Sequence, residues 1–104
     1  MSFKPLKDNE TALKPRLSLQ EPKMFRIYLH NDDFTPMDFV TWLLQRVFHK
    51  NSEESHSLML QIHHNGLALC GVYTHEIAQN KLSHIEQLAS KNGHPLKASI
   101  QEDS

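Results

Sequence analysis

Residues 24–37 read MFRIYLHNDDFTPM, and they decide how the rest of the chain folds. Within 24–30, apolar and more polar residues alternate, which is typical of a strand with one buried face. The Asn-Asp-Asp run at 31–33 favours a turn, because Asn and Asp side chains bond nearby backbone groups. Thr35 can then cap a helix, and Pro36 suits its first turn. A strand is therefore expected to lead through a polar turn into a helix.

Two helices are expected after this turn. The first ends near Lys50-Asn51 and has an apolar stripe at helical spacing, made of Val40, Leu43, Leu44 and Val47. Asn51, with Glu54 three residues later, resembles the capping box of a second helix. That helix is expected to end at Asn65-Gly66, because glycine suits the left-handed position after a helix. Its inner face consists of Leu58, Met59 and Ile62.

A second strand is expected next. Residues 67–73 form an apolar run of strand length. Gly71 inside the run indicates a bulge or a close approach of the backbone. Thr74 is then expected to cap a third helix, with Glu76 in its first turn, where a carboxylate favours the helix dipole.

The third helix keeps a 3.6-residue period through Ile77, Ala78, Leu82, Ile85, Leu88 and Ala89. Asn92-Gly93 closes it, and Pro95 prevents the helix from resuming. A short last strand is expected at 96–100, and the chain is expected to fray from Gln101 onward.

The order strand-helix-helix-strand-helix-strand predicts an α+β fold. We expect a small three-stranded antiparallel sheet with three helices packed on one face. Residues 24–104 form this single domain. Residues 1–23 are polar, rich in Lys and Pro and without period, which predicts a flexible, disordered N-terminal tail.

Composition excludes several classes of protein. The 104 residues suffice for one domain. The tail carries five Lys and Arg against three acids, and the rest carries six against nine, so no basic stripe indicates nucleic acid binding. Cys70 is the one cysteine, which fits a reducing compartment. Without an apolar signal core or a membrane-length apolar run, a soluble, cytoplasmic protein is expected.

Catalytic and metal sites are poorly supported by the sequence. The motifs HExxH, CxxC and GxSxG are absent, and the three glycines are isolated. Cys70 lies in an apolar strand, where a thiol is usually inert. The eight histidines are scattered: His30, His49, His56, His63, His64, His75, His84 and His94. We therefore expect neither an enzyme, nor a cofactor, nor a metal; a small metal protein using His56 and His63 remains an alternative.

Residues 31–37, NDDFTPM, are the candidate binding segment. They can be a simple turn and helix cap, or a small negative socket able to hold a cation. Met37 favours the socket, because a flexible thioether suits varied apolar guests, although it can equally fill the core. On the second helix, Met59 and Ile62 share a face, and His63 borders that face.

These residues and several further motifs resemble the ClpS family, the bacterial adaptors that deliver N-end-rule substrates to the ClpAP protease. The resemblance covers about 24–101, and its motifs appear in the family's order: Asn31 to Met37, Leu58-Met59-Leu60, His63, Cys70-Gly71-Val72-Tyr73-Thr74 and His94-Pro95-Leu96. It implies an adaptor that binds a free N-terminal Leu, Phe, Tyr or Trp and delivers it to a ClpA-type unfoldase for degradation by ClpP.

The resemblance also implies roles for single residues. Asn31, Asp33 and His63 would contact the substrate's α-amino group, with Asp32 supporting them. Glu76 and Lys81 would belong to the surface that docks on the unfoldase N-domain, and 1–23 would take part in substrate hand-over. The pocket for the first side chain would be lined by Leu29, Thr35, Met37, Val40, Met59, Ile62 and Leu96.

Three positions depart from the family's usual residues. Ile62 stands where Val is common, which takes about one methyl group of room from the pocket. Phe34 replaces a common Tyr, and His64 replaces a common aromatic residue beside His63. The adaptor is expected to be a monomer. A protein-docking α+β domain of the ribosomal-stalk type, without a peptide pocket, is the alternative function.

Overall fold

The structure is a computed structural model, and it describes residues 22–103. Of the predicted tail 1–23, all but Pro22 and Lys23 lies outside the described residues. The elements follow the predicted order: β1 (Met24–His30), α2 (Met37–Phe48), α3 (Ser52–Asn65), β2 (Leu67–Thr74), α4 (His75–Lys91) and β3 (Lys97–Asp103). No helix of this part of the chain is long and apolar enough to cross a membrane.

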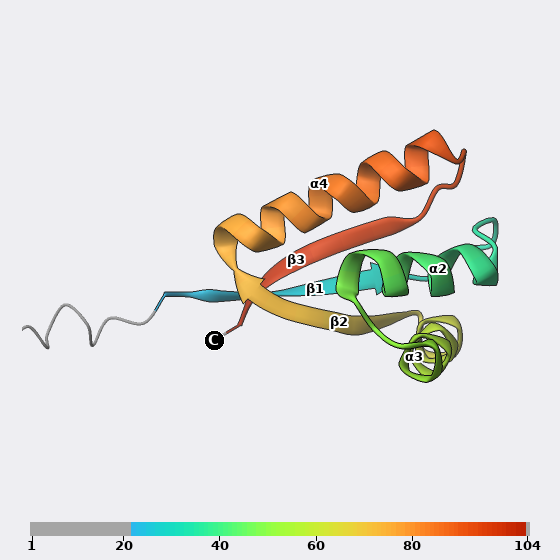
Figure 1. Ribbon diagram of the computed structural model, residues 1–104, viewed down its shortest axis with the longest axis horizontal. Coiled ribbons are helices and arrows are strands. Elements are labelled where there is room, and N and C mark those ends of the chain that lie inside the picture. Colours follow the sequence, from blue (N-terminus) through green and yellow to red (C-terminus); the bar gives the residue numbers. More distant parts are fainter. Residues whose placement is uncertain (1–21, 104) are drawn as a thin grey trace, which may run out of the picture.

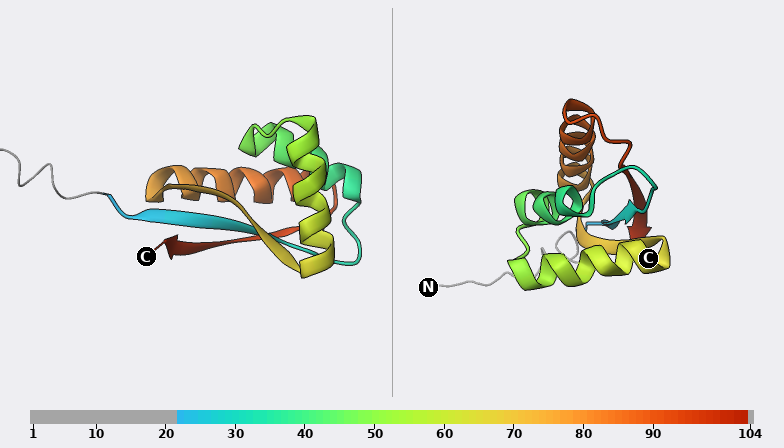
Figure 2. Two further views of the ribbon diagram at one scale, coloured as in Figure 1. Left: turned by 90° about the horizontal axis from the view of Figure 1, so that it is seen from below. Right: turned by 90° about the vertical axis from the view of Figure 1, so that its right-hand side faces the viewer.

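The three strands form one antiparallel sheet in the order β2-β1-β3, with β1 in the centre (Figure 1). Helix α4 lies along one face of the sheet with α2 beside it, and α3 runs across the strand direction near the beginning of β2 (Figure 2). The α+β prediction is confirmed. The end of β1 therefore points toward the region where α2 and α3 meet.

The core lies between the sheet and the helices. Ile27 and Leu29 of β1 are fully buried, as their alternation predicts. The predicted stripe of α2 is buried as well. On α4, the buried residues are Ala78, Ile85 and Ala89. The prediction for Ile77 is wrong, because one residue turns a helix by about 100° and leaves Ile77 47% exposed.

The helix ends differ in detail from the prediction. Helix α2 begins one residue after Pro36, which occupies the N-cap position, so Thr35 is not its cap. Helix α2 also ends earlier, at Phe48, because His49 adopts a left-handed φ of 57°. Thr74 occupies the N-cap position of α4, but its side chain makes no capping hydrogen bond.

The predicted caps of α3 are confirmed. The Glu54 backbone amide donates to Asn51 Oδ1 at 2.7 Å, and the Asn51 amide donates to Glu54 Oε1 at 3.0 Å. Gly66 ends the helix with a φ of 91°, which a residue with a Cβ adopts only with strain. Both ends of α3 are thus fixed by local bonds.

Strand β3 is longer than predicted. It continues to Asp103, whose backbone pairs with Met24 at the beginning of β1. The Arg26 guanidinium donates to Asp103 Oδ1 at 2.7 Å, so a cross-strand ion pair holds the segment that was expected to fray. Sequence patterns do not reveal such a pair, because its partners lie 77 residues apart.

A bulge lies where Gly71 suggested one. Ile27 pairs with Gly71 and Tyr28 with Leu69, which leaves Cys70 as the extra residue. The other expectation for Gly71, a close approach of its backbone to another group, is also met. Because glycine has no side chain, there is room for Tyr73 beside it. A Cβ at this position would lie 2.5 Å from the Tyr73 hydroxyl and 2.6 Å from its ring.

We expect Gly71→Ala to lower the free energy of unfolding by about 1–3 kcal/mol, because the Tyr73 ring would have to move from its packed position. Urea denaturation of the single variants and of the double variant with Tyr73→Ala measures the coupling. In the Tyr73→Ala background, the same glycine substitution should have less than half of this effect. An equal loss in both backgrounds would contradict the steric explanation.

Candidate functional site

A cavity opens where the turn after β1 meets α2 and α3. Its volume is about 650 Å³, including its open mouth. The turn supplies polar groups and the two helices supply mainly apolar groups. It is lined by Asn31, Asp32, Asp33, Thr35, Met37, Val40, Met59, Ile62 and His63. All of these residues were predicted for one site, and the structure brings them together.

One backbone hydrogen bond fixes the turn against α3. The Asn31 amide donates to the carbonyl oxygen of Gly66 at 2.8 Å. Because Gly66 follows the last turn of α3, this bond sets Asn31 beside the end of the helix that carries His63. Residues more than 30 positions apart in the sequence therefore face the same cavity.

The Asp32 carboxylate stabilises the turn by accepting hydrogen bonds from groups of the turn itself. Its Oδ1 accepts hydrogen bonds from the backbone amides of Phe34 and Thr35 at 2.8 and 2.7 Å. Its Oδ2 accepts one from the Thr35 hydroxyl at 2.7 Å. Burial raises the pKa of Asp32, but these hydrogen bonds and the nearby His94 outweigh it, so that the pKa lies below its ordinary value. Thr35 thus supports the turn instead of capping α2.

Asn31, Asp33 and His63 line the cavity with exposed side chains. Within residues 22–103, none of these three side chains makes a hydrogen bond with another group. The His63 ring lies edge-to-face against the ring of His64, with the centroids 5.2 Å apart. The mouth of the cavity therefore presents an amide, a carboxylate and an imidazole that are available to a ligand.

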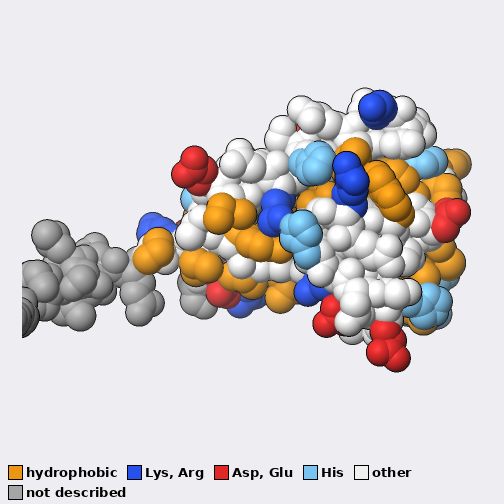
Figure 3. Space-filling model, viewed as in Figure 1, with side chains coloured by type: hydrophobic (Ala, Val, Ile, Leu, Met, Phe, Trp, Pro, Cys, Tyr) orange, Lys and Arg blue, Asp and Glu red, His pale blue; other side chains and the backbone are white. Residues whose placement is uncertain are grey.

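The inner wall is apolar. Val40, Met59 and Ile62 are buried, whereas Met37 at the mouth is 45% exposed. Figure 3 shows hydrophobic side chains at the surface of the right-hand part of the molecule, where α2 and the preceding loop lie. Such a wall suits an aliphatic or aromatic side chain of moderate size.

Leu29 and Leu96 do not line the cavity, although the sequence placed them in its wall. Leu29 lies on the inner face of the central strand and is fully covered, and Leu96 is buried just before β3. Both belong to the core.

Glu76 and Lys81 lie on α4, outside the cavity. Glu76 is exposed. The Lys81 ammonium donates to the carbonyl oxygen of Val47 at 2.7 Å and lies 5.0 Å from the centre of the Tyr73 ring. Lys81 therefore joins α4 to the last turn of α2.

The cavity suits binding better than covalent chemistry. Cys70 lies in the core, where burial raises the pKa of its thiol to about 12 and keeps it protonated. Among residues 22–103, no three His, Cys, Asp or Glu side chains gather in a way that could hold a metal ion. A cation with several N–H donors and an attached apolar group would satisfy both the mouth and the wall.

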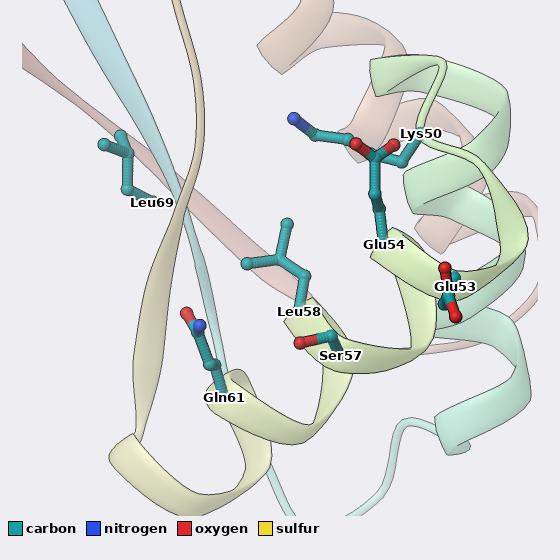
Figure 4. Close-up of a pocket in the computed structure, with 7 residues that line it drawn as sticks. All are labelled: Lys50, Glu53, Glu54, Ser57, Leu58, Gln61 and Leu69. Carbon is teal, nitrogen blue, oxygen red and sulfur yellow. The ribbon is translucent and has the colours of Figure 1, made fainter.

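A separate hollow lies between α3 and β2 (Figure 4). Its side chains stand apart around an open space, and Leu58 and Leu69 are its apolar members. Glu54 at its edge is already bonded in the helix cap. This hollow contains none of the predicted site residues and offers less apolar enclosure.

Sequence reasoning missed Trp42, which lies about one helical turn beyond Asp38 on α2. Its side chain is 41% exposed and lines hollows next to the cavity. The available signal was its spacing, because residues three to four apart share a helix face. The apolar stripe singled out for this helix consists of Val40, Leu43, Leu44 and Val47 and leaves Trp42 out.

Fold and cavity define a small α+β domain built to bind a peptide-like ligand. Comparison with known proteins then identifies the family: its sequence model, described as ATP-dependent Clp protease adaptor protein ClpS, matches residues 20–99. The chain belongs to the ClpS family.

Individual relatives agree. The chain is 45% identical over 84 residues to the Clp protease adapter ClpS of Bartonella quintana, covering 81% of this chain and 76% of that protein. It is 40% identical over 93 residues to ClpS of Caulobacter vibrioides strain NA1000 / CB15N, covering 89% and 84%. Agrobacterium tumefaciens ClpS2 bound to L-phenylalaninamide superimposes with a TM-score of 0.77 at 31% identity, covering 80% of this chain and 100% of that chain.

We expect Asp32→Ala to lower the free energy of unfolding by roughly 1–2 kcal/mol at neutral pH, because three donors lose their acceptor. Because folding lowers the pKa of Asp32, its contribution is complete above the ordinary value of 3.8 and disappears as the pH falls through the folded-state pKa. Urea denaturation at a series of pH values should show a constant difference down to about pH 5 and a shrinking one below 3.8.

Asp33→Ala serves as the control, because the Asp33 side chain makes no hydrogen bond within the described residues. It should change stability little at neutral pH. A difference for Asp32→Ala that stays constant down to about pH 2.5 would contradict the role assigned to the carboxylate.

Proposed function

We propose that this protein is an adaptor that binds the free N-terminal residue of N-degron substrates. It prefers Leu, Phe, Tyr and Trp and delivers the substrate to a ClpA-type AAA+ unfoldase for degradation by ClpP. The observation that carries the proposal is the cavity with unoccupied acceptors at its mouth and an apolar wall behind them. Membership of the ClpS family supports it.

The hydrogen-bond acceptors at the mouth of the cavity match the donors of an α-amino group. That group has a reference pKa near ~8, so it is mostly cationic at neutral pH and offers three N–H donors. The Asn31 carbonyl oxygen, the Asp33 carboxylate and a neutral His63 ring nitrogen supply three acceptors. Asp32 contributes by holding the turn, since its own oxygens are occupied.

The wall matches the first side chain. Thr35, Met37, Val40, Met59 and Ile62 surround the space that this side chain would occupy. The Agrobacterium relative was solved with L-phenylalaninamide, which has a free amine and an aromatic side chain but no carboxylate. An N-terminal Phe in a peptide has the same three features, which supports the assignment of both parts of the site.

The expected affinity is of micromolar order. Charge-assisted hydrogen bonds contribute roughly 1.5–3 kcal/mol each, and burial of a Leu or Phe side chain adds about 1.5–3 kcal/mol. At the upper end of these ranges the three bonds and the side chain together contribute about 12 kcal/mol, and lost translational and rotational freedom removes at least about 4 kcal/mol, which leaves about 8 kcal/mol. Binding of this strength allows capture followed by release.

Selectivity follows from the same groups. Acetylation removes the positive charge and leaves the acceptors short of donors. A charged first side chain would lose its hydration against the apolar wall without gaining a partner. A β-branched Val or Ile would crowd the mouth beside Met37.

Delivery requires a second surface. We assign it to α4, where Glu76 is exposed and available to the unfoldase N-domain. Lys81 is already bonded to Val47 and contributes mainly by holding α4 against α2. The adaptor acts as a monomer and performs no catalysis itself. A docking domain without a peptide pocket, the alternative raised by the sequence, would leave the cavity without a role.

Fluorescence anisotropy of a labelled peptide that begins with Leu tests the proposal. We expect micromolar or tighter binding, lost when the same peptide is N-acetylated, because acetylation removes the ammonium donors. Asp33→Ala should weaken binding at least about tenfold through loss of a charge-assisted bond. Glu86→Ala, an exposed acid-to-alanine change on α4, is the matched control and should bind normally. Equal binding of the free and acetylated peptides would refute the α-amine site.

A second experiment concerns pocket size. Ile62 is almost fully buried and lines the cavity, so Ile62→Val should enlarge it by one methyl group. We expect the affinity for a Trp-initiated peptide to rise by about threefold relative to a Leu-initiated peptide. Ile85→Val, in the core but outside the cavity lining, controls for the loss of stability. An unchanged Trp-to-Leu ratio would show that Ile62 does not limit the pocket.

A further inference from the structure

A second hollow adjoins the cavity between α2 and α3. Its lining is Met37, Asp38, Thr41, Trp42, Gln45, His56 and Met59. Met37 and Met59 line both spaces, so the two methionines form the partition between them. Neither the turn at 31–33 nor His63 reaches the second hollow, which we call the Trp42 furrow.

The order of residues along α3 shows how the cavity and the furrow are placed relative to each other. His63, Met59 and His56 are separated by four and three residues, so they follow one face of the helix. His63 stands at the mouth of the cavity, Met59 at the partition and His56 in the furrow. At about 1.5 Å per residue, His63 and His56 lie roughly 10 Å apart along the helix. The furrow is therefore on the side of the cavity opposite the amine-binding groups.

This arrangement determines where a bound peptide leaves the site. If the proposed function is correct, the α-amino group lies at Asn31, Asp33 and His63, and the first side chain points into the cavity. The backbone carbonyl of the first residue then points away from the amine-binding groups and toward the furrow, which lies on the other side of Met37 and Met59. The following residues of the substrate are directed along the furrow.

We propose that the Trp42 furrow binds the side chain of the third residue of the substrate; this inference rests on the proposed function. Successive side chains of an extended peptide point to opposite sides, and residues one and three lie about 6.5–7 Å apart on the same side. The first side chain enters the cavity, the second faces solvent, and the third reaches the space beyond the two methionines.

The chemistry of the furrow selects that side chain. Trp42 is 41% exposed, and its ring is held by the neighbouring Phe39 ring, with the centroids 5.6 Å apart, and by the Arg46 guanidinium, 5.9 Å from its centre. With Met37 and Met59 it offers a mainly apolar surface that favours an aromatic or large aliphatic residue. Asp38 at the edge disfavours an acidic one.

Three peptides test the inference: they begin Leu-Gly-Phe, Leu-Phe-Gly and Leu-Gly-Gly and share one polar continuation without Trp. We expect Leu-Gly-Phe to bind about fivefold more tightly than the other two, as for a half-buried Phe side chain. Trp42→Ala should remove this difference while leaving the affinity for Leu-Gly-Gly unchanged. Gln61→Ala is the control, since Gln61 lines neither space.

Trp42 also provides a direct signal, because it is the one tryptophan of the 104-residue chain. Its emission should shift to shorter wavelength with Leu-Gly-Phe and much less with Leu-Gly-Gly. Equal affinities for Leu-Gly-Phe and Leu-Phe-Gly, or a preference that survives in Trp42→Ala, would overturn the inference and leave the proposed function intact. Failure of Leu-Gly-Gly itself to bind would overturn both.

A charge variant gives an answer that does not depend on the stability of Trp42→Ala. Asp38 is exposed in the first turn of α2, so Asp38→Lys should retain the fold. We expect the native protein to bind a Leu-Gly-Glu peptide about threefold more weakly than Leu-Gly-Gln, and Asp38→Lys to reverse this order. An identical ratio in both proteins would place the third side chain elsewhere.

Discussion

The hydrogen bond from the Asn31 amide to the Gly66 carbonyl is the constraint on which the site depends. It joins the end of the central strand to the end of α3, where Gly66 adopts a left-handed conformation. The inner bonds of Asp32 then fix the rest of the turn. Because these contacts are made within the protein, the backbone that carries Asn31 and Asp33 is already in place before a ligand arrives. Preorganisation of this kind reduces the entropic cost of binding.

Much of this could be predicted from the sequence, because the signals were local. Alternation in 24–30 and the capping box at Asn51 depend on neighbouring residues, and both are present in the structure. Two predictions were wrong for different reasons. Asp103 is held by Arg26, a partner 77 residues away, whereas Thr35 bonds Asp32 within the same turn instead of capping α2. Pairings across the sheet have no local signature in a single sequence.

The candidate site, too, has features that the sequence could predict and features that it could not. The composition of the turn at 31–33 indicated that a cation could bind, but not which carboxylate would be free. The family resemblance gave Asp33 the contact with the amine and Asp32 a supporting role, and the hydrogen bonds agree with this division, because the Asp32 oxygens accept bonds within the turn. Leu29 and Leu96 were predicted to line the wall from the family resemblance, yet neither is among the residues that line the cavity. Apolar residue types do not by themselves distinguish the surface of a cavity from the core beneath it.

The pairing of Met24 with Asp103 has a consequence for how the molecule can be attached to others. It places the two ends of the described chain side by side, while the turn that forms the cavity follows the opposite end of β1 (Figure 1). Seven strand residues separate these two ends of the domain, a span of about 23 Å. A fusion partner or surface linkage attached directly before Met24 or directly after Asp103 would therefore lie at the end of the sheet opposite the mouth of the cavity. The ends of the described chain therefore lie at one end of the domain, and the cavity lies at the other.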